Sequence, residues 1–100
     1  MHPARIAAAV ALVVAVPLAA QTRIPPPPPG RLLASNCFQC HGTDGRGGFE
    51  ELAGKSANEI YSELKEMQRR SEANDLMVPH AKGYTDEQLR AIGGYFATVR

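Results

Sequence analysis

Two cysteines and a histidine stand together as Cys37-Phe38-Gln39-Cys40-His41. A Cys-x-x-Cys pair followed directly by histidine is typical of covalent haem attachment. Each thiol adds across one haem vinyl group, and the two intervening residues let both sulfurs reach the vinyls from one turn of backbone. The adjacent histidine then binds the iron as an axial ligand. Because the chain has no other cysteine, the motif predicts one haem, held by Cys37 and Cys40 and ligated by His41.

A Cys-x-x-Cys pair by itself is also compatible with a redox dithiol, half of a zinc site or a disulfide. A thioredoxin-like dithiol requires strands, and no segment predicts one convincingly. A zinc site requires two more ligands, and outside the N-terminal leader only His41 and His80 are present. A disulfide would leave a small chain with little core. Haem attachment is therefore favoured, and the thiol alternative predicts free thiols without visible absorbance.

Helices must position this motif, and two of them begin at capping boxes. Ser56 and Thr85 are each followed three residues later by Glu or Gln. The apolar spacing extends the first of these helices to about Glu72 and the second to Val99. The side chains expected to face the core are Ile60, Leu64 and Met67 in the first and Leu89, Ile92, Phe96 and Val99 in the second.

A further helix is predicted over residues 31–37, directly before the motif. Leu33 and Cys37 are four residues apart and therefore share a face. Gly93 lies on the apolar side of the C-terminal helix, where it lowers helix stability. We expect this glycine to permit a close approach of another helix, the one at Leu33.

The remaining segments are expected to be loops or short elements. Residues 42–48 contain four glycines, which let a backbone pass close to a flat cofactor. Phe49 and Leu52 are expected to cover one haem face. Residues 73–84, with Met77, are predicted to be a loop. The fold class is therefore all-α, with three or more helices and no sheet.

The first 20 residues have the layout of a secretory signal peptide. Arg5 precedes an apolar run over residues 6–16, which Pro17 ends, and cleavage is expected at Ala19 or Ala20. The run is short for a membrane span, so no stable membrane anchor is expected; an uncleaved anchor is the alternative. Because c-type haem is attached outside the cytoplasm in bacteria, the leader and the motif together predict a periplasmic protein.

The part after the leader is close to charge-neutral. The chain has eleven Lys and Arg, of which Arg5 belongs to the leader, against ten Asp and Glu. This balance, without a basic stripe, argues against nucleic-acid binding. Residues 25–29 are all proline and favour an extended spacer; a partner-docking peptide is the alternative.

Three stretches together resemble the class I c-type cytochromes. They are the segment from Cys37 to Gly45, the Leu52-Ala53-Gly54 segment, and Met77 followed by Ala81-Lys82-Gly83-Tyr84-Thr85-Asp86-Glu87. The likeness is closest to the cytochrome subunit of flavocytochrome c sulfide dehydrogenase and its single-haem relatives. In these proteins a methionine precedes an Ala-Lys-Gly-Tyr-Ser-Asp-Glu segment at the same separation.

The resemblance implies a small class I cytochrome c-like fold wrapped around one covalent haem c. The predicted organisation is a signal peptide at 1–20, a proline-rich linker at 21–30 and a cytochrome c domain at 31–100. The resemblance further implies that Met77 is the distal iron ligand. A thioether is a suitable ligand for haem iron. Met77 is expected in a loop, and not among the apolar side chains that face the core from a helix. His80 and Met67 are the alternatives.

One departure from the family pattern concerns His41. Many class I cytochromes have a proline soon after the motif, whose carbonyl accepts the histidine N–H. This chain has no proline between Pro29 and Pro79. Another backbone carbonyl, near residues 49–52, is expected to orient His41.

The predicted function is periplasmic electron transfer by a protein that is not itself an enzyme. The resemblance implies a flavoprotein partner that oxidises sulfide and passes electrons to the haem. A freely diffusing carrier for another dehydrogenase or oxidase is one alternative. A haem enzyme or sensor with an open distal site is another.

Overall fold

The computed structural model describes residues 1–17, 23–71 and 75–100. These residues form helices and no strand, which confirms the all-α prediction. In chain order the elements are α1 (Arg31–Ala34), the 3-10 turn η2 (Ser35–Cys37), α2 (Phe38–His41), the 3-10 turn η3 (Thr43–Gly45), α3 (Ala57–Gln68), α4 (Met77–Lys82) and α5 (Asp86–Thr98).

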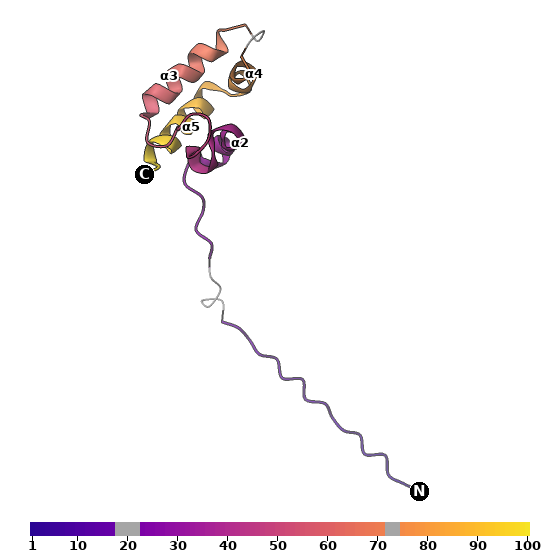
Figure 1. Cartoon of the computed structure of the whole chain (residues 1–100). Coiled ribbons are helices and arrows are strands. Elements are labelled where there is room, and N and C mark those ends of the chain that lie inside the picture. The colour runs from indigo at the N-terminus through magenta and orange to yellow at the C-terminus, as the bar shows by residue number, and fades with distance from the viewer. Residues whose placement is uncertain (18–22, 72–74) are drawn as a thin grey trace.

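The N-terminal residues 1–17 form no helix or strand and extend away from the helical body (Figure 1). The expected cleavage point, at Ala19 or Ala20, lies outside the described residues. Among the described residues, no helix is long and apolar enough to span a membrane.

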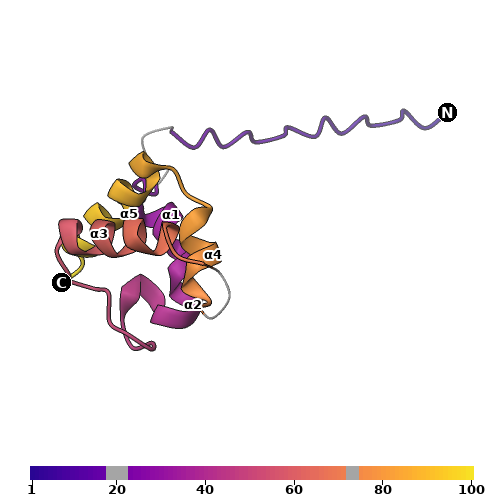
Figure 2. The ribbon, with the colours of Figure 1, turned by 90° about the horizontal axis from the view of Figure 1, so that it is seen from above.

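Helices α3 and α5 pack against each other and form the centre of the fold (Figures 1 and 2). Helix α4 packs on α3, and α1 packs on α5. Met67 and Val99 are only partly buried. The other side chains predicted to face the core are buried, and they are Ile60, Leu64, Leu89, Ile92 and Phe96. The buried core consists of Ala34, Leu52, Ile60, Leu64, Val78, Ala81, Leu89, Ile92, Tyr95 and Phe96.

Both predicted helix starts are confirmed. Thr85 Oγ1 accepts the Gln88 N–H at 3.2 Å, and Gln88 Oε1 accepts the Thr85 N–H at 2.9 Å, which completes a capping box. Ser56 Oγ accepts the backbone N–H of the residue three positions on at 3.1 Å. Helix α3 ends at Gln68, short of the predicted end at Glu72, which lies outside the described residues.

The close approach at Gly93 involves a different helix from the one expected. A Cβ on Gly93 would lie 2.6 Å from the carbonyl oxygen of Ala57, at the start of α3. The helix that contains Leu33 meets α5 elsewhere: a Cβ on Gly30 would lie 2.2 Å from the Ala91 carbonyl oxygen. The two short backbone approaches therefore fix α5 against α3 on one side and α1 on the other.

Two further local predictions need correction. The predicted helix at 31–37 divides into α1 and the 3-10 turn η2, and α2 continues through the motif. Leu52 is 9% exposed and Phe49 is 93% exposed, and their contact with a haem face stays a prediction. The predicted loop at 73–84 contains α4. Pro79 is compatible with this helix because a proline in the first turn removes no intrahelical hydrogen bond.

Candidate functional site

A largely apolar cleft opens between the motif and helices α3, α4 and α5. It has two lobes, of about 530 Å³ and 440 Å³ including their open mouths. We name them the His80 lobe and the Met67 lobe, because each of those residues lines only one of them. The side chains that line both lobes are Cys37, His41, Leu64, Met77 and Ile92.

His41 is buried at the end of α2 and has a fixed ring orientation. Its Nδ1 lies 2.9 Å from the carbonyl oxygen of Glu50. A carbonyl oxygen only accepts hydrogen bonds, so Nδ1 carries the proton and Nε2 keeps its lone pair for a metal. This contact confirms that a carbonyl within residues 49–52 orients the imidazole.

The glycine-rich loop brings that carbonyl back to the motif. The Phe49 N–H donates to the Cys40 carbonyl oxygen at 2.9 Å. A Cβ on Gly48 would lie 2.2 Å from the carbonyl carbon of His41, so only glycine permits this approach. Lys55 Nζ lies 2.5 Å from Glu50 Oε1, which lowers the pKa of the Glu50 carboxyl and ties down the segment that orients His41.

Asp44 joins the turn after the motif to two helices. Its backbone is in the left-handed region (φ 58°). Its Oδ1 accepts hydrogen bonds from the Tyr95 hydroxyl of α5 and, at 3.2 Å, from Arg31 Nε of α1. The Tyr95 hydrogen bond, followed by the Arg31 charge, holds the pKa of Asp44 below its usual value. No sequence signal identified this cluster, because its three members are far apart along the chain.

The two cysteines lie at the His80 lobe and line it together. Cys37 is half-buried and Cys40 is exposed. Burial raises the pKa of the Cys37 thiol. Among the described residues, no cluster of three or more His, Cys, Asp or Glu side chains is arranged to hold a metal ion, so the zinc alternative finds no ligand set there.

The three candidates for a second axial ligand differ in position. Met77 lines both lobes, as His41 does. His80 is exposed and lines the His80 lobe and a neighbouring polar groove, whereas Met67 lines only the Met67 lobe. Met77 lies on α4 rather than in a loop, which corrects the structural reason first given for it. Because Met77 lines both lobes, its position still favours it over His80 and Met67 as the candidate for the second ligand.

Comparison with known proteins decides the family. The chain is 37% identical over 68 residues to cytochrome c-554(548) of Halomonas halodenitrificans, covering 62% of this chain and 82% of that protein. The chain belongs to the class I c-type cytochromes. No family model matches the chain. Covalently bound haem c is the cofactor of this class, as the motif predicted, and the helical fold agrees with the class.

Two further relatives of this cytochrome are named after dehydrogenases. The cytochrome subunit of sulfide dehydrogenase of Chlorobaculum tepidum is 36% identical over 72 residues, covering 70% of this chain and 66% of that protein. The thiosulfate dehydrogenase electron acceptor of Stutzerimonas stutzeri is 36% identical over 69 residues, covering 63% of this chain and 32% of that protein. The match thus spans just under two thirds of the first relative and about a third of the second.

The residues of the cleft fit a covalent haem. Two thiols at the attachment spacing lie beside an imidazole whose Nε2 is unprotonated. Met77 supplies a thioether to the same cleft. The side chains of Leu64 and Ile92 give it apolar walls, which suit a large flat macrocycle.

Proposed function

We propose that this cytochrome is a periplasmic one-electron carrier with one haem, attached through Cys37 and Cys40 and ligated by His41 and Met77. The bound haem supplies an iron that changes its oxidation state by one electron. The observation that carries the proposal is that His41 and Met77 line both lobes of one apolar cleft. With His41 and Met77 both bound to the iron, no position would remain on it for a substrate.

Each axial residue has a separate role in this proposal. The Glu50 carbonyl holds the His41 proton on Nδ1 and strengthens the imidazole as a donor through Nε2. As a ligand, the Met77 thioether would favour the reduced iron and raise the reduction potential. Burial of the haem among the apolar side chains of the cleft would raise the potential further.

We infer that residues 1–20 direct export, that residues 21–30 form a spacer and that residues 31–100 form the cytochrome domain. The motif supports the export proposal, because attachment of c-type haem takes place outside the cytoplasm in bacteria. N-terminal sequencing of protein purified from the periplasm tests it. A chain that begins shortly after Ala19 or Ala20 supports a cleaved leader, and an intact Met1 in a membrane fraction contradicts it.

We propose that the electron donor is a dehydrogenase. The first candidate is a flavoprotein that oxidises sulfide. The relative from Chlorobaculum tepidum is named as a cytochrome subunit of sulfide dehydrogenase, which supports this choice. A freely diffusing carrier is the second candidate, because the Halomonas halodenitrificans relative is named simply as a cytochrome. Co-purification of a flavin-containing chain supports the first, and a monomer that reacts equally with unrelated donors supports the second.

Optical spectra of the oxidised and reduced protein, produced in a host that matures c-type cytochromes, test the central proposal. We expect a covalent c-type spectrum with the weak near-infrared band of methionine ligation. A haem spectrum without that band contradicts Met77 and moves the assignment to His80 or to an open site. Strong binding of carbon monoxide by the native reduced protein supports the open site.

A further inference from the structure

Helix α4 carries Met77 but is too short to be stable alone. It contains six residues, from Met77 to Lys82, and isolated helices of this length do not persist in water. Contacts with the rest of the protein therefore decide where Met77 lies. Two buried side chains of α4, Val78 and Ala81, turn one face of the helix toward the interior. Hydrogen bonds at the ends of α4 add to this packing.

Gln68 supplies the directional contact at the C-terminal end of α4. It is the last residue of α3, and its Nε2 donates to the carbonyl oxygens of Ala81 at 2.9 Å and Tyr84 at 3.0 Å. The final carbonyls of a helix have no intrahelical partner, and the backbone bond from the Tyr84 N–H to Ala81 is long, at 3.4 Å. The half-buried amide of Gln68 thus uses both of its protons to tie α4 and the following turn to α3.

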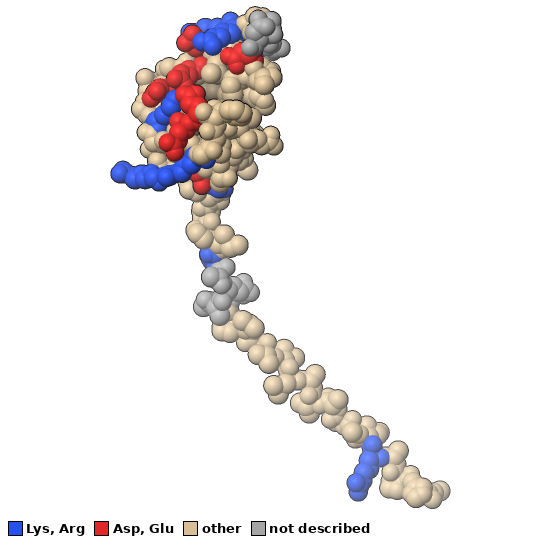
Figure 3. Space-filling model, in the orientation of Figure 1, with Lys and Arg blue, Asp and Glu red and all other residues tan. Residues whose placement is uncertain are grey.

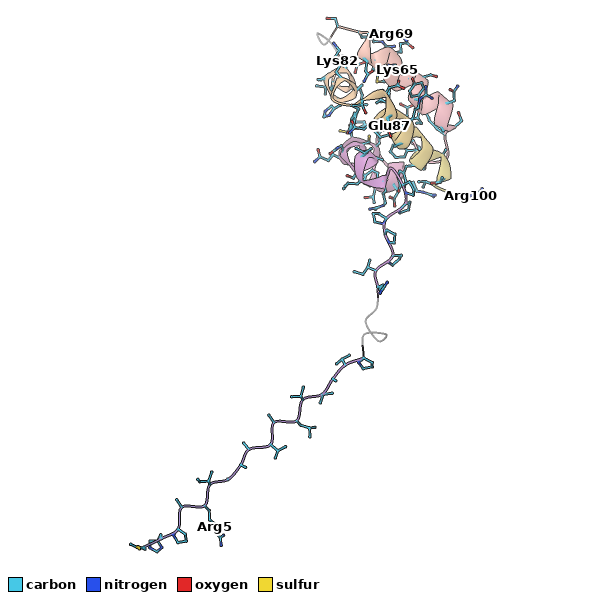
Figure 4. All side chains as sticks on the ribbon, turned by 180° about the vertical axis from the view of Figure 1, so that it is seen from behind. Arg5, Lys65, Arg69, Lys82, Glu87 and Arg100 are labelled. Carbon is cyan, nitrogen blue, oxygen red and sulfur yellow. The ribbon has the colours of Figure 1, made fainter. Side chains whose placement is uncertain are left out.

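The N-terminal end of α4 is held by Asp75, which forms an ion pair with Arg70, just after the end of α3. Asp75 Oδ1 accepts the Met77 N–H at 2.9 Å, and Arg70 lies 3.7 Å from Asp75. Because the Arg70 side chain is half exposed, this ion pair contributes little. Figure 4 shows that Arg69, at the end of α3, and Lys82, at the end of α4, lie at the same end of the helical body.

We propose that Gln68 is a positioning residue, which acts through the backbone of α4 to keep the Met77 thioether in the cleft opposite His41. The inference rests on the proposed ligation by Met77. His80, three residues after Met77, lines the His80 lobe but not the Met67 lobe. The position of α4 therefore determines which of the two side chains reaches both lobes, and the Gln68 amide holds the C-terminal end of α4 in that position.

The test is a titration of the oxidised holoprotein with imidazole, which competes with Met77 for the metal. In Gln68→Leu, which has a similar volume and a strong helix-forming side chain, both hydrogen bonds are lost. Two hydrogen bonds correspond to a rise of roughly 5- to 150-fold in the equilibrium constant for release of Met77. We expect the apparent imidazole affinity to rise by the same factor, and the near-infrared band to disappear at a lower temperature.

Gln68→Glu keeps the shape of the side chain and, when ionised, cannot donate to either carbonyl. It should show the same direction of change and decides the matter if the leucine variant does not fold. Arg70→Gln is the matched control at the other end of α4, with an expected change in imidazole affinity below about twofold. Tyr95→Phe is the control for general destabilisation, because it removes a hydrogen bond to Asp44 that does not involve α4, and it should leave the methionine band intact.

The outcomes separate this inference from the proposed function. If the wild-type protein lacks the methionine band, ligation by Met77 fails and the role of Gln68 fails with it. If the wild type shows the band but both Gln68 variants bind imidazole within about twofold of the wild-type affinity, the role of Gln68 is overturned and the proposed function stands. An equal change in Tyr95→Phe likewise contradicts a specific positioning role.

Discussion

The two sides of the cleft are built differently. On the side of His41, the ring is held by a backbone carbonyl, and the turn that follows is anchored by Asp44 to α1 and α5. On the side of Met77, a six-residue helix is held by the buried Val78 and Ala81 and by hydrogen bonds to Gln68 and Asp75. We infer that the histidine side stays formed under conditions that already release the methionine side.

The charged surface does not follow this division. Acidic side chains form a band across the helical body, and basic groups lie at its ends (Figure 3). Arg100 lies far from Arg69 and Lys82 (Figure 4). Exposed ion pairs, such as that between Arg90 and Asp86 at 3.2 Å, contribute little stability. Exposed ion pairs therefore do not account for the difference between the two sides.

The largest expected effect is that of Met77→Ala, which removes the thioether from the methionine side of the cleft. The reduction potential should fall by on the order of 0.1 V, a fraction of the roughly 0.8 V over which axial ligands vary haem potentials. The reduced protein should also bind carbon monoxide. Potentiometric titration with optical detection measures both effects, and an unchanged optical spectrum would exclude Met77 as a ligand.

Gly48→Ala is expected to disturb the loop that packs against His41 on the histidine side of the cleft. An added Cβ meets backbone atoms of His41 and Cys40 at 2.2 and 2.3 Å, and backbone cannot move aside cheaply. We expect a loss of stability at or above the upper end of the roughly 1–3 kcal/mol typical of overpacking. Thermal unfolding of the holoprotein measures it.

Gly94→Ala is the matched control for that loss. No atom lies within 4 Å of the added Cβ, so the variant should gain about 0.5–1 kcal/mol in helix stability. A Gly48→Ala protein as stable as the wild type would show that the loop need not approach His41 so closely.

The smallest effect is expected at acid pH and concerns Asp44. Its pKa in the folded protein is below the ordinary value of 3.8, so ionised Asp44 stabilises the fold above that pH. This contribution is lost as the pH falls through the lowered pKa. Asp44→Asn should therefore unfold at a lower temperature than the wild type near neutral pH, with a smaller difference below pH 3.8. A difference that stays constant with pH contradicts the role of the charge.

Local chemistry explains which features were predictable. The N-caps at Ser56 and Thr85 depend on residues within one helical turn, so their spacing identifies them directly. The reciprocal side-chain bond of a capping box forms at Thr85, and at Ser56 only the cap itself is present. The haem motif is equally local. By contrast, Pro79 and Gly83 indicated a loop where α4 forms, because the burial of Val78 and the hydrogen bonds from Gln68 stabilise a short helix there. Such long-range contacts leave no periodic signal in the sequence.

The sequence by itself therefore determined the class of cofactor, the helical class of the fold and the need for a carbonyl near His41. Only the tertiary structure decided which carbonyl this is, that Met77 shares both lobes with His41, and that Gly93 faces α3. The reason is physical: attachment chemistry and helix caps act over a few bonds of backbone, whereas the walls of the cleft come from segments that only packing brings together.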